Sequence, residues 1–196
     1  MGIISVLNEN NTAKRRDYVI IASFIVYSIF EVISLIEFVK RKNKSLVKEL
    51  IVSYVLTSVF LLLLYFFKIS VPKYMIILFL LTLVMNTFLG YYFNLYIKTK
   101  TFDRYLHTFV SFTSSILAYT IIIDIFNEAI DSEVFSAIIV FSLGMTLGTI
   151  FEIIEFTSDK LKKTKHQHGL TDTDFDMIFN MIGAVIAAVY SVLFIF

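Results

Sequence analysis

The fold is decided by the stretch from Gly148 to Gly183, which has the sequence GTIFEIIEFTSDKLKKTKHQHGLTDTDFDMIFNMIG. An apolar run lies at each end, and carboxylates, histidines and an asparagine collect between them. Apolar runs of about 20 residues are long enough to cross a bilayer as helices. The stretch therefore predicts two membrane-spanning helices joined at one membrane face, with polar side chains gathered at that face.

The rest of the chain repeats this pattern. Hydrophobic residues make up 58% of the 196 residues, against roughly 45–50% in soluble domains. There is one proline, no cysteine and no linker-like segment, so we expect a single integral membrane domain over residues 1–196 without disulfides or thiolate metal sites. The predicted fold class is an all-α polytopic bundle of about six spans. These cover about residues 17–39, 50–67, 74–97, 105–126, 134–156 and 174–196.

Charge predicts the orientation in the cell membrane and excludes one class of partner. The connections at 40–48, 98–104 and 160–165 hold most of the Lys and Arg residues. By the positive-inside rule, these connections are cytoplasmic and both termini lie outside. The formal net charge is +1 and the basic residues form no patch on a folded domain, so nucleic acid is not an expected partner.

Each of the last three spans carries one narrow polar stripe at helical spacing, in steps of three or four residues. Because alternate connections share a membrane face, the charged ends of all three stripes are expected at the same face. The stripes consist of Asp103, His107 and Ser111 on the fourth span, Glu152 and Glu155 on the fifth, and Asp172, Asp176, Asn180 and Gly183 on the sixth.

These residue types predict a shared polar pocket. An ionisable side chain in hydrocarbon costs at least about 2.5–3.5 kcal/mol, so each must face the bundle, a cavity or the headgroup region. Carboxylates brought together from several helices need a shared proton or a bound cation, and His with carboxylates suits Mn²⁺, Fe²⁺, Zn²⁺ or Mg²⁺. The predicted metal ligands are Asp103, His107, Glu155, Asp172 and Asp176, the predicted catalytic groups are Glu152, Glu155 and His107, and Asn180, Ser111 and Gly183 complete the pocket.

Structural roles are the alternative for the same residues. Glu152 and Glu155 could pair with Lys162 or Lys163 at a helix end, and His107 could be an interfacial residue bonded to Asp103. Small and amide residues also favour close helix packing, which is our preferred role for Gly183. The remaining expectations are that His166 and His168 are solvated and that Asp172 or Asp174 caps the last helix.

Three segments resemble a known family: FDRYLH (102–107), GTIFEIIEF (148–156) and HQHGLTDTDFDMIFNMIGA (166–184). They are similar to the YjdF-type family of small bacterial and archaeal membrane proteins, which implies an arrangement of residues and no catalytic assignment. A more distant similarity is to VanZ-like proteins, some associated with glycopeptide resistance, which share D-[KR]-x-x-H and D-x-x-x-N-x-x-G. Their E-x-x-Q motif has a second carboxylate here, at Glu155, so a resistance role does not carry over.

The leading hypothesis is a membrane protein whose polar pocket binds a divalent cation and holds or acts on a lipid headgroup or a lipid-linked envelope precursor. Membrane lipids are then its partners. One alternative is a small cation- or proton-coupled transporter, although the stripes fade to Ser114 and Ala187 away from the pocket. The other is a non-catalytic immunity or scaffold protein. Catalysis, metal identity and oligomeric state stay open at this stage.

Overall fold

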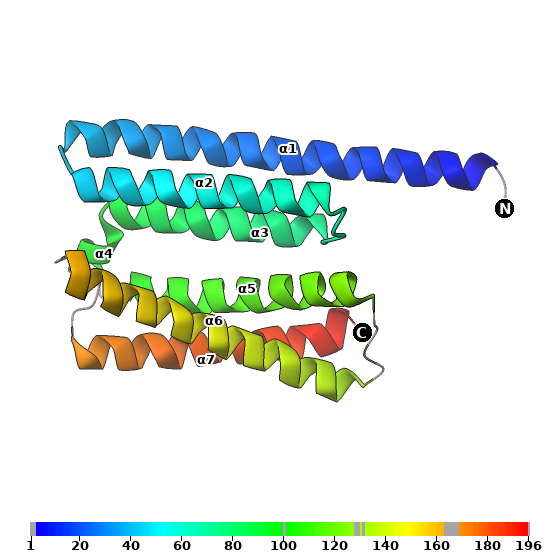
Figure 1. The fold of residues 1–196 in the computed structure, drawn as a ribbon. Helices are drawn as coiled ribbons and strands as arrows, with labels where there is room; N and C mark the ends of the chain where they lie inside the picture. Colours follow the sequence, from blue (N-terminus) through cyan, green and yellow to red (C-terminus); the bar gives the residue numbers. More distant parts are fainter. Residues whose placement is uncertain (1–2, 100, 128–129, 131, 163–168, 196) are drawn as a thin grey trace.

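The protein is all-helical (Figure 1), in a computed structural model that describes residues 3–99, 101–127, 130, 132–162 and 169–195. Among these residues six helical segments are long and apolar enough to cross a membrane, with α3 and η1 forming one of them. The predicted all-α fold class is confirmed. The elements are α1 (Ile3–Lys40), α2 (Lys44–Phe66), α3 (Lys73–Val84), the π-helix η1 (Met85–Tyr92), α4 (Leu95–Lys98), α5 (Phe102–Phe126), α6 (Glu133–Lys162) and α7 (Leu170–Phe194).

The spans form two groups. Helices α5, α6 and α7 pack on one another, and α1 packs on α2 and α3, while α3 also contacts α5 and so joins the groups (Figure 1). Apolar side chains cover the outside: Val32, Leu56 and Ile153 expose 54%, 63% and 56% of their surface. Such exposure suits a surface that faces lipid hydrocarbon.

One end of the bundle holds α4, the α1–α2 turn, the start of α5, the end of α6 and the start of α7, whereas both termini lie towards the other end (Figure 1). We call the first of these the loop end. The charged ends of the three predicted stripes all lie there, as expected from the alternation of connections.

The third span differs from its prediction. A continuous helix was expected from 74 to 97, but the chain forms a π-helix from Met85 and leaves helical geometry at Asn94, which has the left-handed φ of 58°. Asparagine tolerates this conformation better than most residues. The Phe93 N–H donates to the Phe88 carbonyl at 3.0 Å, which is the i→i−5 spacing of a π-turn. Residues 95–97 of the predicted span therefore belong to the separate helix α4.

Arg41 stabilises this break from another helix. Its guanidinium donates to the carbonyl oxygens of Tyr91 (3.1 Å) and Tyr92 (2.8 Å) at the end of η1. Glu37 accepts from Arg41 Nε at 2.9 Å and holds the guanidinium in place. Carbonyls that the break leaves without intrahelical donors thus gain partners from α1.

Two helix starts also differ from expectation. Helix α2 begins at Lys44, well before the expected residue 50, and Asn43 caps it by accepting from the Leu46 N–H at 3.2 Å. Helix α7 begins after Gly169, whose φ of 120° favours glycine. The Gly169 carbonyl already accepts from the Asp172 N–H at 3.1 Å, so the expected cap at Asp172 or Asp174 is wrong because both lie inside the helix.

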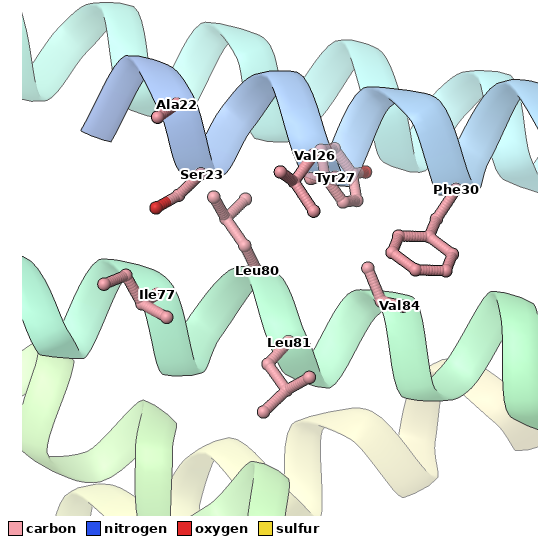
Figure 2. Close-up of a pocket in the computed structure, with 9 residues that line it drawn as sticks. All are labelled: Ala22, Ser23, Val26, Tyr27, Phe30, Ile77, Leu80, Leu81 and Val84. Atoms are coloured by element: carbon pink, nitrogen blue, oxygen red, sulfur yellow. The ribbon is translucent and has the colours of Figure 1, made fainter. Parts of the chain in front are cut away.

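Aromatic rings pack the group of helices formed by α1, α2, α3 and η1. Tyr27 stacks on Tyr54 with ring centroids 5.7 Å apart, and Phe30 meets Phe88 edge-on at 4.8 Å. An open apolar groove of about 290 Å³ lies between α1 and α3. Figure 2 shows the residues that line it, from Ala22 and Ile77 to Phe30 and Val84. The groove is separate from the polar residues of α5, α6 and α7, so it adds nothing to their chemistry.

Candidate metal centre

Helices α5 and α7 bring three ligand-type side chains together at the loop end. Asp103, His107 and Asp176 each offer one ligand atom, and these atoms lie within 4.8 Å of one another. His107 and Asp176 are buried and Asp103 is half-buried. Asp103 and His107 share a helix face because they are four residues apart. One imidazole nitrogen and two carboxylate oxygens form a ligand set that suits several divalent transition metals.

The orientation of the His107 ring follows from its neighbours. Nδ1 lies 3.3 Å from the Asn180 amide oxygen, which can only accept, so Nδ1 carries a proton in this arrangement. Nε2 lies 3.6 Å from Asp103 Oδ1 and 3.5 Å from Glu152 Oε1. A neutral ring therefore directs the Nε2 lone pair at two carboxylates, and either a second proton on the ring or a cation would relieve that repulsion.

Close contact between α6 and α7 places Asn180. A Cβ atom at Gly148 would lie 2.7 Å from Asn180 Cγ, so only glycine leaves room for the amide. One turn earlier, a Cβ at Gly144 would lie 2.7 Å from Ala184 Cβ. The Gly144-x-x-x-Gly148 pair thus faces Asn180-x-x-x-Ala184, which is the small-residue packing typical of membrane helices.

Helix α5 approaches its two neighbours just as closely. A Cβ at Gly183 would collide with the Thr108 carbonyl oxygen. Thr108 Oγ1 donates to the Phe179 carbonyl at 3.0 Å, and Ser111 Oγ donates to the Gly144 carbonyl at 3.2 Å. Ser111 and Gly183, expected as pocket residues, therefore contribute to the contacts between helices that hold the ligand-type side chains in register.

Negative charge dominates around this group. The carboxyl of Asp176 is close enough to Asp103, Asp172 and Glu152 to interact with their charges, and Arg104 is a cation nearby. The Arg104 guanidinium lies over the Phe175 ring, 3.9 Å from its centroid. Among the described residues, Asp176 Oδ1 and Asn180 Nδ2 are buried without a hydrogen-bond partner.

The other predicted site residues lie around the three-residue group. Glu152 contacts His107, while Glu155 and Asp172 lie outside the group, and Glu155 interacts with the charges of Asp103, Glu152 and Asp176. The expected ion pairs with Lys162 or Lys163 involve side chains outside the described part of the chain. His166 and His168 also lie outside it.

Tyr96 is a neighbour of the site that we did not expect. Helix α4 folds back so that the Tyr96 hydroxyl donates to Asn86 Oδ1 at 2.5 Å, with the ring packed where Gly90 lacks a side chain. Burial, followed by the nearby Tyr91 and the charges of acidic residues that include Asp103, raises the pKa of Tyr96 well above its ordinary 10.0. The contact of Tyr96 with Asn86 depends on the unexpected break at Asn94, after which α4 folds back.

Comparison with known proteins agrees that the chain is a membrane protein. Residues 19–195 match the family described as "Predicted membrane protein (DUF2238)". The chain belongs to this family. It is also 35% identical over 101 residues to a Thermotoga maritima protein described as "Uncharacterized protein". That match spans about half of each protein, 50% of this chain and 52% of the relative. No solved structure matches the chain.

Proposed function

We propose that this DUF2238 protein binds one divalent cation at the loop end and uses the site to hold or act on a phosphate or ester headgroup of a membrane lipid or a lipid-linked envelope precursor. Asp103, His107 and Asp176 are the proposed ligands. The observation that carries the proposal is their convergence within 4.8 Å. Asn180 supports it by bonding His107 Nδ1 and leaving Nε2 for a cation, which is how metal-bound histidines are usually oriented.

Charge favours a cation over a purely structural cluster. Protonating His107 would neutralise part of the charge of Asp103 and Glu152, but Asp176, Asp172 and the other nearby carboxylates would remain. A divalent ion supplies two positive charges and gives the buried Asp176 Oδ1 a partner. A divalent cation therefore offsets the negative charge of the site better than a proton on His107 alone.

The motif resemblances support the same group of residues. The two motifs shared with VanZ-like proteins contain Asp103 and His107 on one helix and Asp176 and Asn180 on another. These four side chains come together at the site although the whole of α6 lies between the two pairs in the sequence. The similarity to YjdF-type proteins covers the same positions, and we propose that this arrangement is the functional part of the resemblance.

In the enzymatic form of the proposal, the carboxylates of α6 handle protons. Glu152 Oε1 lies 3.5 Å from His107 Nε2, next to the ligands, so its carboxylate could accept a proton from a water or hydroxyl nucleophile at the site. Glu155, one turn further along α6 and within range of the charges of Asp103 and Asp176, would return a proton to the leaving group. A divalent cation would supply charge stabilisation at a phosphate or ester oxygen.

Metal analysis of the full chain tests the binding step. We expect about one equivalent of Mn²⁺ or Zn²⁺ after loading, a higher melting temperature with metal than with chelator, and the loss of both in Asp176→Asn and His107→Gln. Asp124→Asn is the matched control, because Asp124 bonds the Ser70 N–H in a different part of the bundle. The absence of stoichiometric metal in the wild type, with equal stability in the two site variants, would overturn the proposal.

We also propose that the loop end faces the cytoplasm, as the basic connections predict. The chain has no cysteine, so single cysteines can report sidedness without background. Thr101→Cys at the loop end and Ser132→Cys at the other end are both exposed positions. In intact cells an impermeant maleimide should label Ser132→Cys and spare Thr101→Cys; the reverse pattern would invert the orientation.

A further inference from the structure

A second buried carboxyl lies in the other group of helices. Glu31 exposes 3% of its surface and lies about 13 Å along α1 from Lys40, at 1.5 Å per residue. It is therefore well inside the span that covers Tyr18–Lys40. The Thr87 hydroxyl on η1, itself buried, forms a hydrogen bond with the Glu31 carboxyl.

Glu31 has no opposite charge to offset its own. Within the described part of the chain no ion pair is found for it, and Arg41, just beyond the end of α1, is engaged by Glu37. Tyr27 on the same helix interacts with the charge of Glu31 and packs on Tyr54 of α2, while η1 contributes the Thr87 hydroxyl. An ionised carboxylate at this depth, with a single hydroxyl donor, would carry a large desolvation cost.

The surroundings instead suit a neutral carboxylic acid. Ser34, one turn beyond Glu31, is fully buried, and its hydroxyl has no partner among the described residues. The Tyr27 ring, one turn before Glu31 on α1, stacks on Tyr54, and Glu31 is itself almost fully buried. A protonated carboxyl both accepts from Thr87 and has an O–H to donate, so it matches hydroxyl neighbours without leaving a bare charge.

We propose that Glu31 is a proton-binding site inside the membrane, separate from the Asp103, His107 and Asp176 group. The carboxyl carries its proton when η1 packs on α1 through Thr87. Asn86, the residue before Thr87, accepts from Tyr96 at the loop end. Release of the proton would place an unpaired charge against η1, which carries both Thr87 and Asn86, the acceptor of Tyr96 on α4. This inference goes beyond the proposed function and does not depend on metal binding.

Labelling with dicyclohexylcarbodiimide tests the proposal, because this apolar reagent enters membranes and reacts with protonated carboxyls. In the purified full chain in lipid nanodiscs, we expect an adduct on the peptide that contains Glu31, and several-fold less of it at about pH 9 than at about pH 6, as the acid loses its proton. Glu31→Gln should remove that adduct. Glu37→Gln is the matched control on the same helix and should retain it, because Glu37 is ion-paired and half-buried.

Two outcomes would overturn the assignment. One is the absence of an adduct at Glu31 over this pH range, or an adduct whose yield does not change with pH. The other is suppression of the adduct by Na⁺ at constant pH, which would show a metal cation at the site in place of a proton. Both measurements use the wild-type chain, so they hold even if Glu31→Gln fails to fold.

Discussion

The two groups of helices bury polar side chains in different ways. Between α5, α6 and α7, glycines and Ala184 allow the backbones to approach, so acids, an imidazole and an amide from separate helices gather in one small group. Between α1, α2 and η1, aromatic rings fill the space and Glu31 has the Thr87 hydroxyl as its partner. Small-residue packing therefore assembles a site from many residues, whereas aromatic packing isolates one carboxyl.

The largest expected effect on stability comes from replacing one glycine by alanine in each of the two groups of helices. In Gly183→Ala the new Cβ meets the Thr108 carbonyl, which is backbone and can move only with α5; in Gly90→Ala it meets the Tyr96 ring, which can rotate. Since overpacking costs typically about 1–3 kcal/mol, we expect about 3 kcal/mol for Gly183→Ala and about 1 kcal/mol for Gly90→Ala. Thermal unfolding in detergent measures both, and an equal or larger loss in Gly90→Ala would contradict the contrast.

A second comparison uses the two intramembrane asparagines. Asn180→Ala removes the partner of His107 Nδ1, and loss of such a partner lowers metal affinity about 10- to 100-fold. Asn86→Ala removes an acceptor of Tyr96 in the other half and should leave metal affinity unchanged. Calorimetric titration of both variants with Mn²⁺ or Zn²⁺ gives the two constants; equal affinities would show that Asn180 does not orient a ligand.

A smaller effect is expected at the Tyr96–Asn86 hydrogen bond. Tyr96→Phe should cost about 1 kcal/mol near neutral pH, the usual net contribution of one hydrogen bond. The raised pKa of Tyr96 adds a pH dependence, because above pH 10.0 the Tyr96 phenol keeps its proton in the folded state and loses it in the unfolded state. The stability that this phenol contributes is therefore complete below pH 10.0 and falls as the pH rises further. Denaturation between about pH 8 and pH 11 should show a steeper fall in the wild type than in Tyr96→Phe; parallel curves would argue against the buried phenol.

The smallest effect is expected for Glu31→Gln. If the Glu31 carboxyl is neutral, an amide of the same shape keeps the Thr87 hydrogen bond and changes stability by less than about 1 kcal/mol. Asp176→Asn should instead remove all of the metal-dependent stabilisation. Melting temperatures with and without metal distinguish the two substitutions, and a metal-dependent change in Glu31→Gln would connect sites that we treat as separate.

Helical periodicity found most of the candidate site before any contact was known. Steps of three and four residues placed Asp103 with His107 and Asp176 with Asn180, and alternation of the connections placed them at one face. The same approach missed Tyr96, because nothing in the apolar run around it signals that the helix breaks at Asn94. The ligand roles of Glu155 and Asp172 stay predictions, because both lie outside the three-residue group and periodicity gives the face of a helix, not the distance to its neighbours.

By itself, the sequence determined that the chain crosses a membrane as an all-helical bundle and which faces of the last three spans are polar, since hydropathy and helical period are local properties. Only the tertiary structure decided which side chains meet. Gly148 sets the position of Asn180, Asn180 orients His107, and Arg41 stabilises the end of η1 from a different helix. These contacts depend on how closely helices approach, which is a property of paired surfaces that no single segment contains.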